Sequence, residues 1–144
     1  MIVVDAMILT YALIRGPGHT PAVNQLLDAG RAWAAPPLWR SELRNVLLQY
    51  VRVSEEERPG GPVTLDDARQ KMGLAETMIA DRTFAVDSDS VLDRAKRSGL
   101  SAYDAEYVVL AQDIDAPLAT VDNTLLEAVP EVAFRPEKIA ASEH

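Results

Sequence analysis

Residues 1–14 have the sequence MIVVDAMILTYALI, an apolar segment whose periodicity changes at a single acidic residue, Asp5. The β-branched run at residues 2–4 predicts a short strand that is covered on both faces. Beyond Asp5, apolar residues recur at helical spacing, which predicts a helix that ends at the Gly-Pro-Gly sequence of residues 16–18. A buried strand followed at once by a helix is typical of a parallel α/β protein.

The alternation of strands and helices continues along the whole chain. Thr64 with Asp67, and Ser101 with Asp104, have the spacing of a capping box at the start of a helix. The segment SEEERPGGP, residues 54–62, resembles a flexible connection but is too short to link two domains. The expected fold class is α/β, with a central parallel sheet, helices on both faces and one domain over residues 1–144. Strands are predicted at residues 31–37, 83–86, 116–121 and 132–136, and helices at residues 20–29, 38–51, 64–80, 90–98 and from 102 onward.

Composition excludes several kinds of site. The chain of 144 residues is 48% hydrophobic and contains no cysteine, so disulfides, thiolate nucleophiles and cysteine-based metal centres are excluded. The two histidines, His19 and His144, are too few for an imidazole-rich metal site. Asp5 interrupts the first apolar run and no basic region precedes it, so we expect no signal peptide, and no apolar stretch is long enough to span a membrane. A cytoplasmic location is compatible with these features.

Net charge at first argues against a nucleic-acid partner. The chain carries 14 basic and 22 acidic residues, a formal net charge of −8, whereas phosphate binding normally needs a basic surface. The charge is uneven, however, because residues 1–52 sum to +2 and residues 53–112 and 113–144 sum to −5 each. The positions of the acidic residues are therefore more informative than the total.

Four acidic residues are expected near one edge of the sheet. Asp5 and Asp122 each follow a predicted strand, and ligands of parallel α/β proteins bind outside the carboxyl ends of the strands. Glu42 and Asp104 lie in helices that should pack beside those strand ends.

Each of these acids also has a purely structural interpretation. Asp5 could be the N-cap of the following helix, and Asp104 the acidic residue of a capping box with Ser101. Glu42 could be a solvated glutamate on the exposed face of its helix, and Asp122 could begin a turn. The common placement of all four at one sheet edge favours a functional interpretation.

Clustered carboxylates without a basic partner favour a divalent cation. Like charges raise one another's pKa unless a cation neutralises them, and Mg²⁺ or Mn²⁺ prefers oxygen ligands. Such a site can activate water and hold a phosphodiester during in-line attack. Other phosphoryl chemistries fit less well, because Met7 stands where a haloacid-dehalogenase-like site needs a second aspartate, and no phosphate-binding glycine loop is present.

Four ordered motifs resemble those of the PIN domain family, in particular the bacterial VapC-type toxins of type II toxin–antitoxin systems. They are VVDAMIL (residues 3–9), LWRSELRNVL (38–47), LSAYDAEYVVLA (100–111) and LATVDNTL (118–125). The resemblance covers essentially the whole chain. It implies a three-layer α/β/α sandwich and a ribonuclease that uses Mg²⁺ or Mn²⁺.

The resemblance also implies roles for individual residues. Asp5, Glu42, Asp104 and Asp122 match the acidic quartet of the family, and Asn45 matches an asparagine often found one turn after the glutamate. The sequence departs from the pattern at Met7, where a small polar residue is common, and at Thr124, where many members have a further acid. The number of metal ions, one or two, stays open. Family members are usually homodimers that a small antitoxin protein inhibits by covering the acidic site.

The leading hypothesis is therefore a metal-dependent endoribonuclease with an RNA substrate. Asp5, Asp104 and Asp122 are expected to hold the metal, while Glu42 completes the cluster or orients the attacking water. The alternative is a catalytically silent PIN-like module that binds protein or nucleic acid. Candidate phosphate-binding residues are Arg15, Arg40 and Arg44, and residues that belong either to an interface or to the core are Trp33, Trp39 and Tyr50.

Overall fold

The computed structural model describes residues 1–14, 20–57 and 61–142, and a sheet of four parallel strands lies at its centre. The strand order is β2-β1-β3-β4, so β1 lies between β2 and β3, with Val3 opposite both Ala34 and Leu118. The strand order therefore reverses between β1 and β3. The strands are β1 (Ile2–Val4), β2 (Trp33–Ala34), β3 (Leu118–Ala119) and β4 (Ala133–Phe134).

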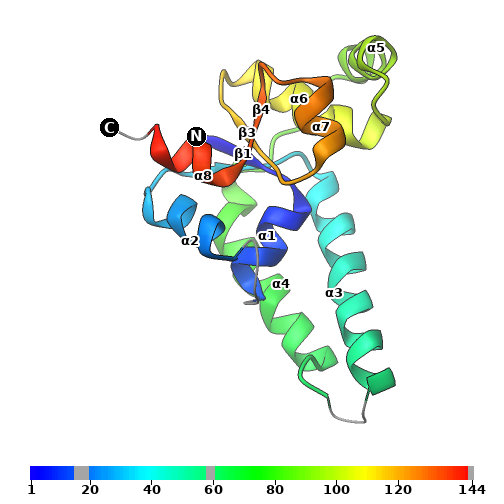
Figure 1. Cartoon of the computed structure of the whole chain (residues 1–144). Coiled ribbons are helices and arrows are strands. Elements are labelled where there is room, and N and C mark those ends of the chain that lie inside the picture. Colours follow the sequence, from blue (N-terminus) through cyan, green and yellow to red (C-terminus); the bar gives the residue numbers. More distant parts are fainter. Residues whose placement is uncertain (15–19, 58–60, 143–144) are drawn as a thin grey trace.

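Helices lie on both faces of the sheet (Figure 1), which confirms the expected α/β architecture. On one side α6 packs on β1 and β3, and α5 packs on α6; on the other, α4 packs on β2 and α1 packs against α2, α3 and α4. The helices are α1 (Ala6–Leu13), α2 (Thr20–Asp28), α3 (Leu38–Glu57), α4 (Leu65–Ile79), α5 (Ser88–Ser98), α6 (Ala102–Asp113), α7 (Asn123–Ala128) and α8 (Pro136–Ala141), with the short 3-10 helix η1 (Ala80–Arg82) after α4.

The apolar segment at the start of the chain forms the middle of the core. All three residues of β1 are fully buried, as the continuous β-branched run predicts for a central parallel strand. Trp33 and Trp39 are also buried, so the core interpretation is correct for both, while Tyr50 is half-buried. None of the helices in the described part of the chain is both long and apolar enough to cross a bilayer.

The predicted strand at residues 83–86 is reduced to a single bridge. Ala35 pairs with Thr83: its N–H donates to the Arg82 carbonyl, and its own carbonyl accepts from the Phe84 N–H. The next N–H that would donate to this neighbour is that of residue 37, two positions after Ala35; Pro37 has no N–H, so the hydrogen-bond ladder does not continue. For this reason the prediction of a full strand was wrong.

The prediction of a flexible connection at residues 54–62 was also wrong in part, because α3 continues to Glu57. Ser54 is buried and its hydroxyl accepts from the Val63 N–H at 2.9 Å, which ties the helix end to the returning chain. Gly61 approaches Ser54 so closely that a Cβ there would lie 2.5 Å from the Ser54 carbonyl oxygen. α3 and α4 extend away from the sheet as a helical hairpin (Figure 1). Residues 58–60, and the predicted helix end at 16–18, lie outside the described residues.

Two helices near the end of the chain were not predicted. The sequence at Asp122 indicated a turn as one alternative, but Asp122 is the N-cap of α7. The predicted strand at residues 132–136 ends at Phe134, because Pro136 occupies the first turn of α8, where its missing N–H is tolerated. Asp122 is thereby held at the start of a helix that directly follows β3.

Candidate functional site

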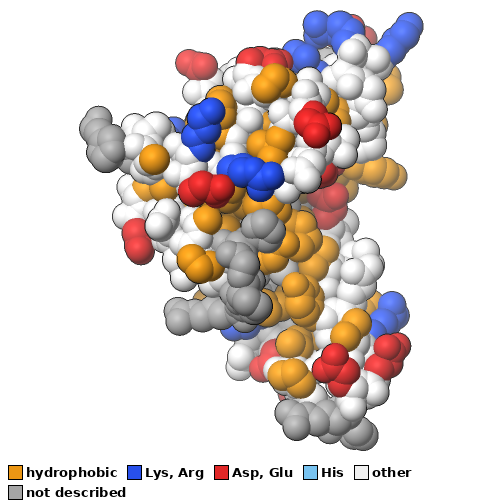
Figure 2. Space-filling view, viewed as in Figure 1, with side chains coloured by type: hydrophobic (Ala, Val, Ile, Leu, Met, Phe, Trp, Pro, Cys, Tyr) orange, Lys and Arg blue, Asp and Glu red, His pale blue; other side chains and the backbone are white. Residues whose placement is uncertain are grey.

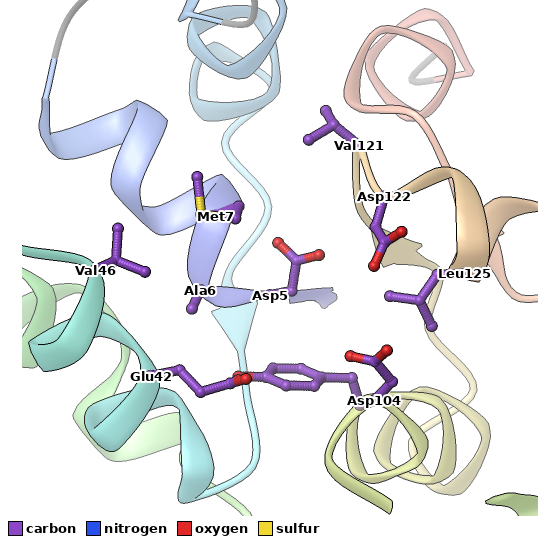
Figure 3. A pocket seen from close by; sticks show the side chains of 10 residues that line it. Asp5, Ala6, Met7, Glu42, Val46, Asp104, Val121, Asp122 and Leu125 are labelled. Carbon is purple, nitrogen blue, oxygen red and sulfur yellow. The ribbon is translucent and has the colours of Figure 1, made fainter. Parts of the chain in front are cut away.

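A cleft of about 320 Å³ opens at the carboxyl ends of β1 and β3, where the strand order reverses. All four acids singled out from the sequence line it, and Figure 3 shows the carboxylates of Asp5, Asp104 and Asp122 facing a shared space. The complete lining consists of Asp5, Ala6, Met7, Glu42, Val46, Asp104, Tyr107, Val121, Asp122 and Leu125.

Asp5 lies at the centre of this cleft and is also the N-cap of α1. Its Oδ1 accepts from the Ile8 N–H at 3.0 Å, and its Oδ2 accepts from the Thr120 hydroxyl at 2.5 Å. Burial raises the pKa of Asp5 to about 6, the charges of Glu42 and Asp122 add to this rise, and the two hydrogen bonds oppose it. The capping and functional interpretations of Asp5 are thus compatible, because one carboxylate caps the helix and borders the cleft.

Thr120 connects two of the acids and was not predicted from the sequence to be part of the site. Its side chain is fully buried, its hydroxyl donates to Asp5, and the same oxygen accepts from the Asp122 N–H at 3.1 Å. The signal in the sequence was a hydroxyl within the apolar run LATV, directly at the end of a predicted strand. Thr120 therefore fixes the strand ends that carry Asp5 and Asp122 relative to each other.

Glu42 projects from α3 and meets a tyrosine from α6. The Tyr107 hydroxyl donates to Glu42 Oε1 at 2.5 Å, and the Tyr107 side chain is 1% exposed. Burial raises the pKa of Glu42, and the charges of Asp104 and Glu106 add to this effect. Glu42 is therefore a half-buried group with a specific partner and not a solvated helix glutamate.

Asp104 and Asp122 occupy the first turns of two helices beside the cleft. The Asp104 N–H donates to the Ser101 hydroxyl at 3.0 Å, as expected for a helix beginning at residue 102. Burial and the charge of Asp122 raise the pKa of Asp104. Asp122 Oδ1 accepts from the Thr124 N–H at 2.9 Å, so Thr124 supports Asp122 through its backbone.

No recorded ion pair within residues 1–14, 20–57 and 61–142 neutralises these four acids. Arg40, two residues from Glu42, instead forms two hydrogen bonds to Glu76, at 2.7 and 3.1 Å. Arg40 is therefore paired with Glu76 in this conformation, and phosphate binding by Arg40 stays a prediction. Arg44 is exposed, and Arg15 lies outside the described residues.

The donor chemistry of the cleft fits a hard divalent cation. Its polar lining offers carboxylate oxygens, the ligands that Mg²⁺ and Mn²⁺ prefer, and burial and mutual repulsion raise the pKa of three of them, Asp5, Glu42 and Asp104. In this conformation, no three potential ligand side chains among the described residues lie close enough together to hold one ion. The acids surround the cleft without converging on a single point.

Asn45 does not line the cleft. It lies on α3 one turn after Glu42, and its side chain is exposed. Met7 and Val46 instead form an apolar wall, and Figure 2 shows hydrophobic side chains gathered over α1 and the adjoining part of α3. In the same view, Lys and Arg side chains gather over α5, away from these helices.

An acidic cleft at the point where the strand order reverses defines the chain as an α/β protein with a carboxylate-lined site. The model of the family described as "PIN domain" matches residues 2–131, and the chain belongs to this family. Comparison with curated protein sequences finds no match.

Solved structures share this fold at low sequence identity. Protein PAE2754 from Pyrobaculum aerophilum has a TM-score of 0.72 and 21% identity, and the match covers 99% of this chain and 88% of that one. A toxin–antitoxin complex from Klebsiella pneumoniae has a TM-score of 0.67 and 16% identity, with 94% and 98% coverage. FitAcB from Neisseria gonorrhoeae has a TM-score of 0.63 and 18% identity, also with 94% and 98% coverage.

Proposed function

We propose that this protein is a metal-dependent endoribonuclease and the toxin of a type II toxin–antitoxin system. The observation that supports the proposal most strongly is the set of four carboxylates around one cleft, with no basic partner recorded among the described residues. Membership of the PIN domain family and the likeness to a chain of a toxin–antitoxin complex support it further.

The proposed roles follow from where each carboxylate lies. Asp5, Asp104 and Asp122 would hold Mg²⁺ or Mn²⁺, and Glu42 would complete the site or orient the attacking water. When bound, the cation supplies a water of lowered pKa and stabilises negative charge on the phosphodiester. Thr120 would keep Asp5 and Asp122 in register, since its hydroxyl contacts both residues.

The proposal includes partners and a compartment. An antitoxin protein would cover the cleft, and the active toxin would be a homodimer in the cytoplasm with RNA as its substrate. Among the described residues no lysine or arginine lines the cleft, and Arg40 is already paired with Glu76, so RNA binding should be weak without the cation.

A second candidate function is a silent module that binds protein or nucleic acid without cleavage. The observation that favours it is that the described carboxylates do not converge on one ion in this conformation. The raised pKa of Asp5 argues against it, because retaining a buried charge without a bound cation would lower stability.

The test is cleavage of a structured RNA by the wild type, with Mn²⁺ or with EDTA. We expect cleavage that requires Mn²⁺ and that falls at least about 100-fold in Asp5→Asn, because the cation would lose a ligand and its electrostatic stabilisation. Asp87→Asn is the matched control, since Asp87 also caps a helix but lies outside the cleft. It should retain activity within about twofold. No Mn²⁺-dependent cleavage of any of a varied set of RNAs by the wild type would contradict the enzyme and favour the silent module.

A further inference from the structure

Tyr107 lines the cleft and forms a hydrogen bond across it, from α6 to the carboxylate of Glu42 on α3. Its hydroxyl donates to Glu42 Oε1 at 2.5 Å, and the two residues are 65 positions apart, on α6 and α3. Tyr107 belongs to the main core and is 1% exposed. The buried ring therefore holds its hydroxyl in a fixed place at the edge of the cleft.

Glu42 has no other recorded partner among the described residues that would fix its carboxylate. The nearby arginine that could have paired with it, Arg40, is turned toward Glu76 by two hydrogen bonds and lies over the Trp39 ring at 4.9 Å. A glutamate side chain has three rotatable bonds, so without a partner it would sample several orientations. The hydrogen bond from Tyr107 selects among these orientations.

The two oxygens of Glu42 are thereby made unequal. Oε1 accepts the Tyr107 hydroxyl, whereas no hydrogen bond to Oε2 is recorded among the described residues. Asp5 differs, because both of its oxygens accept a hydrogen bond, one from Ile8 and one from Thr120. Glu42 thus retains one oxygen with its full capacity to accept, directed by a rigid neighbour.

We propose that Tyr107 is a positioning residue that fixes Glu42 so that Oε2 is the oxygen available to a divalent cation or to its water. This inference rests on the proposed function. It assigns to the site a residue that touches neither cation nor substrate and acts through Glu42. Partners of this kind commonly change metal affinity by 10-fold or more when they are removed.

The experiment compares Mn²⁺ binding, measured by calorimetry with the metal alone, in four forms of the full chain. These are the wild type, Tyr107→Phe, Glu42→Gln and the double variant. The change to phenylalanine removes only the hydroxyl and leaves a ring in the core. Tyr103→Phe is the matched control, because Tyr103 is on the same helix but is 64% exposed and does not line the cleft.

We expect Tyr107→Phe to weaken Mn²⁺ binding at least about 10-fold and Tyr103→Phe to change it less than about twofold. In the Glu42→Gln background, removing the Tyr107 hydroxyl should have almost no further effect, since the carboxylate that it positions is gone. A general loss of packing would weaken binding equally in both backgrounds and would overturn the proposal. If the wild type binds Mn²⁺ and Tyr107→Phe binds it with unchanged affinity, the proposal is overturned as well, while the proposed function is left intact. A wild type that binds no Mn²⁺ would count against both.

A second measurement does not depend on the folding of Tyr107→Phe. In protein labelled with ¹³C at the ζ carbon of tyrosine, the Tyr107 resonance reports its hydroxyl hydrogen bond, and the other three tyrosines are assigned from their phenylalanine variants. Adding Mg²⁺ to the wild type should shift the Tyr107 resonance through Glu42, and Glu42→Gln should remove most of that shift. A Tyr107 resonance that is indifferent to Mg²⁺ would overturn the proposal.

Discussion

Asp5 and Asp87 occupy the same position in two different helices, and their environments differ. Each is an N-cap whose carboxylate accepts from the backbone N–H three residues later, at 3.0 Å for Asp5 with Ile8 and at 2.9 Å for Asp87 with Ser90. Burial raises the pKa of Asp5 to about 6, whereas hydrogen bonds from Ser90 lower the pKa of the exposed Asp87.

A second pair repeats this contrast one turn into a helix. Asp67 in α4 and Asp104 in α6 are both the third helical residue after a hydroxyl N-cap, Thr64 and Ser101. Hydrogen bonds with Thr64 lower the pKa of Asp67, whereas burial and the charge of Asp122 raise that of Asp104. The hydroxyl N-cap favours the charged form of the acid at both helices, but at Asp104 burial and the charge of Asp122 outweigh it.

The two pairs distinguish acids whose position is explained by capping from acids whose position is not. Capping accounts fully for Asp67 and Asp87, because their charged forms are favoured where they lie. It does not account for Asp5 and Asp104, whose charged forms are disfavoured by the fold. Strongly perturbed carboxylates in a cleft are typical of functional sites.

The largest expected effect in this comparison is a pH dependence of stability that arises from Asp5. The folded pKa of about 6 lies above the value of 3.8 for an unperturbed aspartate. Between these two values the folded protein holds a proton that the unfolded chain has released. The free energy of unfolding in EDTA should therefore fall by up to about 3 kcal/mol as the pH rises from about 4 to about 6 and above. Urea unfolding at a series of pH values measures this.

Asp5→Asn should remove most of that decrease, because asparagine does not titrate and remains a good N-cap. Asp87→Asn is the control, because the contribution of Asp87 to stability depends on pH in the opposite direction. The pKa of Asp87 is lowered on folding, so its contribution is present near neutrality and is lost only as the pH falls below the usual aspartate value. An identical slope between pH 4 and 6 in the wild type and in Asp5→Asn would show that Asp5 is not the source.

The next effect is stabilisation by a divalent cation. A ligand that binds only the folded state adds about 2.7 kcal/mol at 100 times its dissociation constant, which corresponds to a rise in Tm of several degrees for a chain of this size. We expect this rise for the wild type and Asp87→Asn in Mn²⁺, and a much smaller one for Asp5→Asn. Thermal unfolding followed by circular dichroism measures it. Equal shifts in all three proteins would place the bound cation away from Asp5.

Much of the sheet and the cleft could be predicted from the sequence, because both depend on local patterns. The apolar run before Asp5 predicts β1, and the run before Asp122 predicts β3; parallel strands place the residues that follow them at one edge. The helix that carries Glu42 is predicted by apolar residues that recur at helical spacing. Predicting these features requires only the order of apolar and polar residues along the chain.

The hydrogen-bond partners of Tyr107 and Thr120 could not be predicted, although the hydroxyl within the apolar run LATV distinguished Thr120 itself. Their hydrogen bonds to Glu42 and Asp5 join residues 65 and 115 positions apart, and no local pattern specifies such pairs. In the sequence, Tyr107 is one of several apolar residues of α6 and has the appearance of a core residue, which it also is. The pairing depends on how α3 and α6 pack, which only the folded chain shows.

The smallest expected effect compares Asp104 with Asp67. Asp67→Ala removes the carboxylate that accepts from the Thr64 N–H at 2.9 Å and should lower the free energy of unfolding in EDTA at pH 7. Asp104→Ala should leave it unchanged or raise it, because it removes a charge that burial and Asp122 disfavour. Urea unfolding of both variants measures the difference, and the sign for Asp104→Ala should reverse in saturating Mn²⁺ because the variant would lose a ligand. If Asp104→Ala instead destabilised the protein as much as Asp67→Ala, with and without Mn²⁺, Asp104 would be a structural cap like Asp67, and the site would rest on Asp5, Glu42 and Asp122.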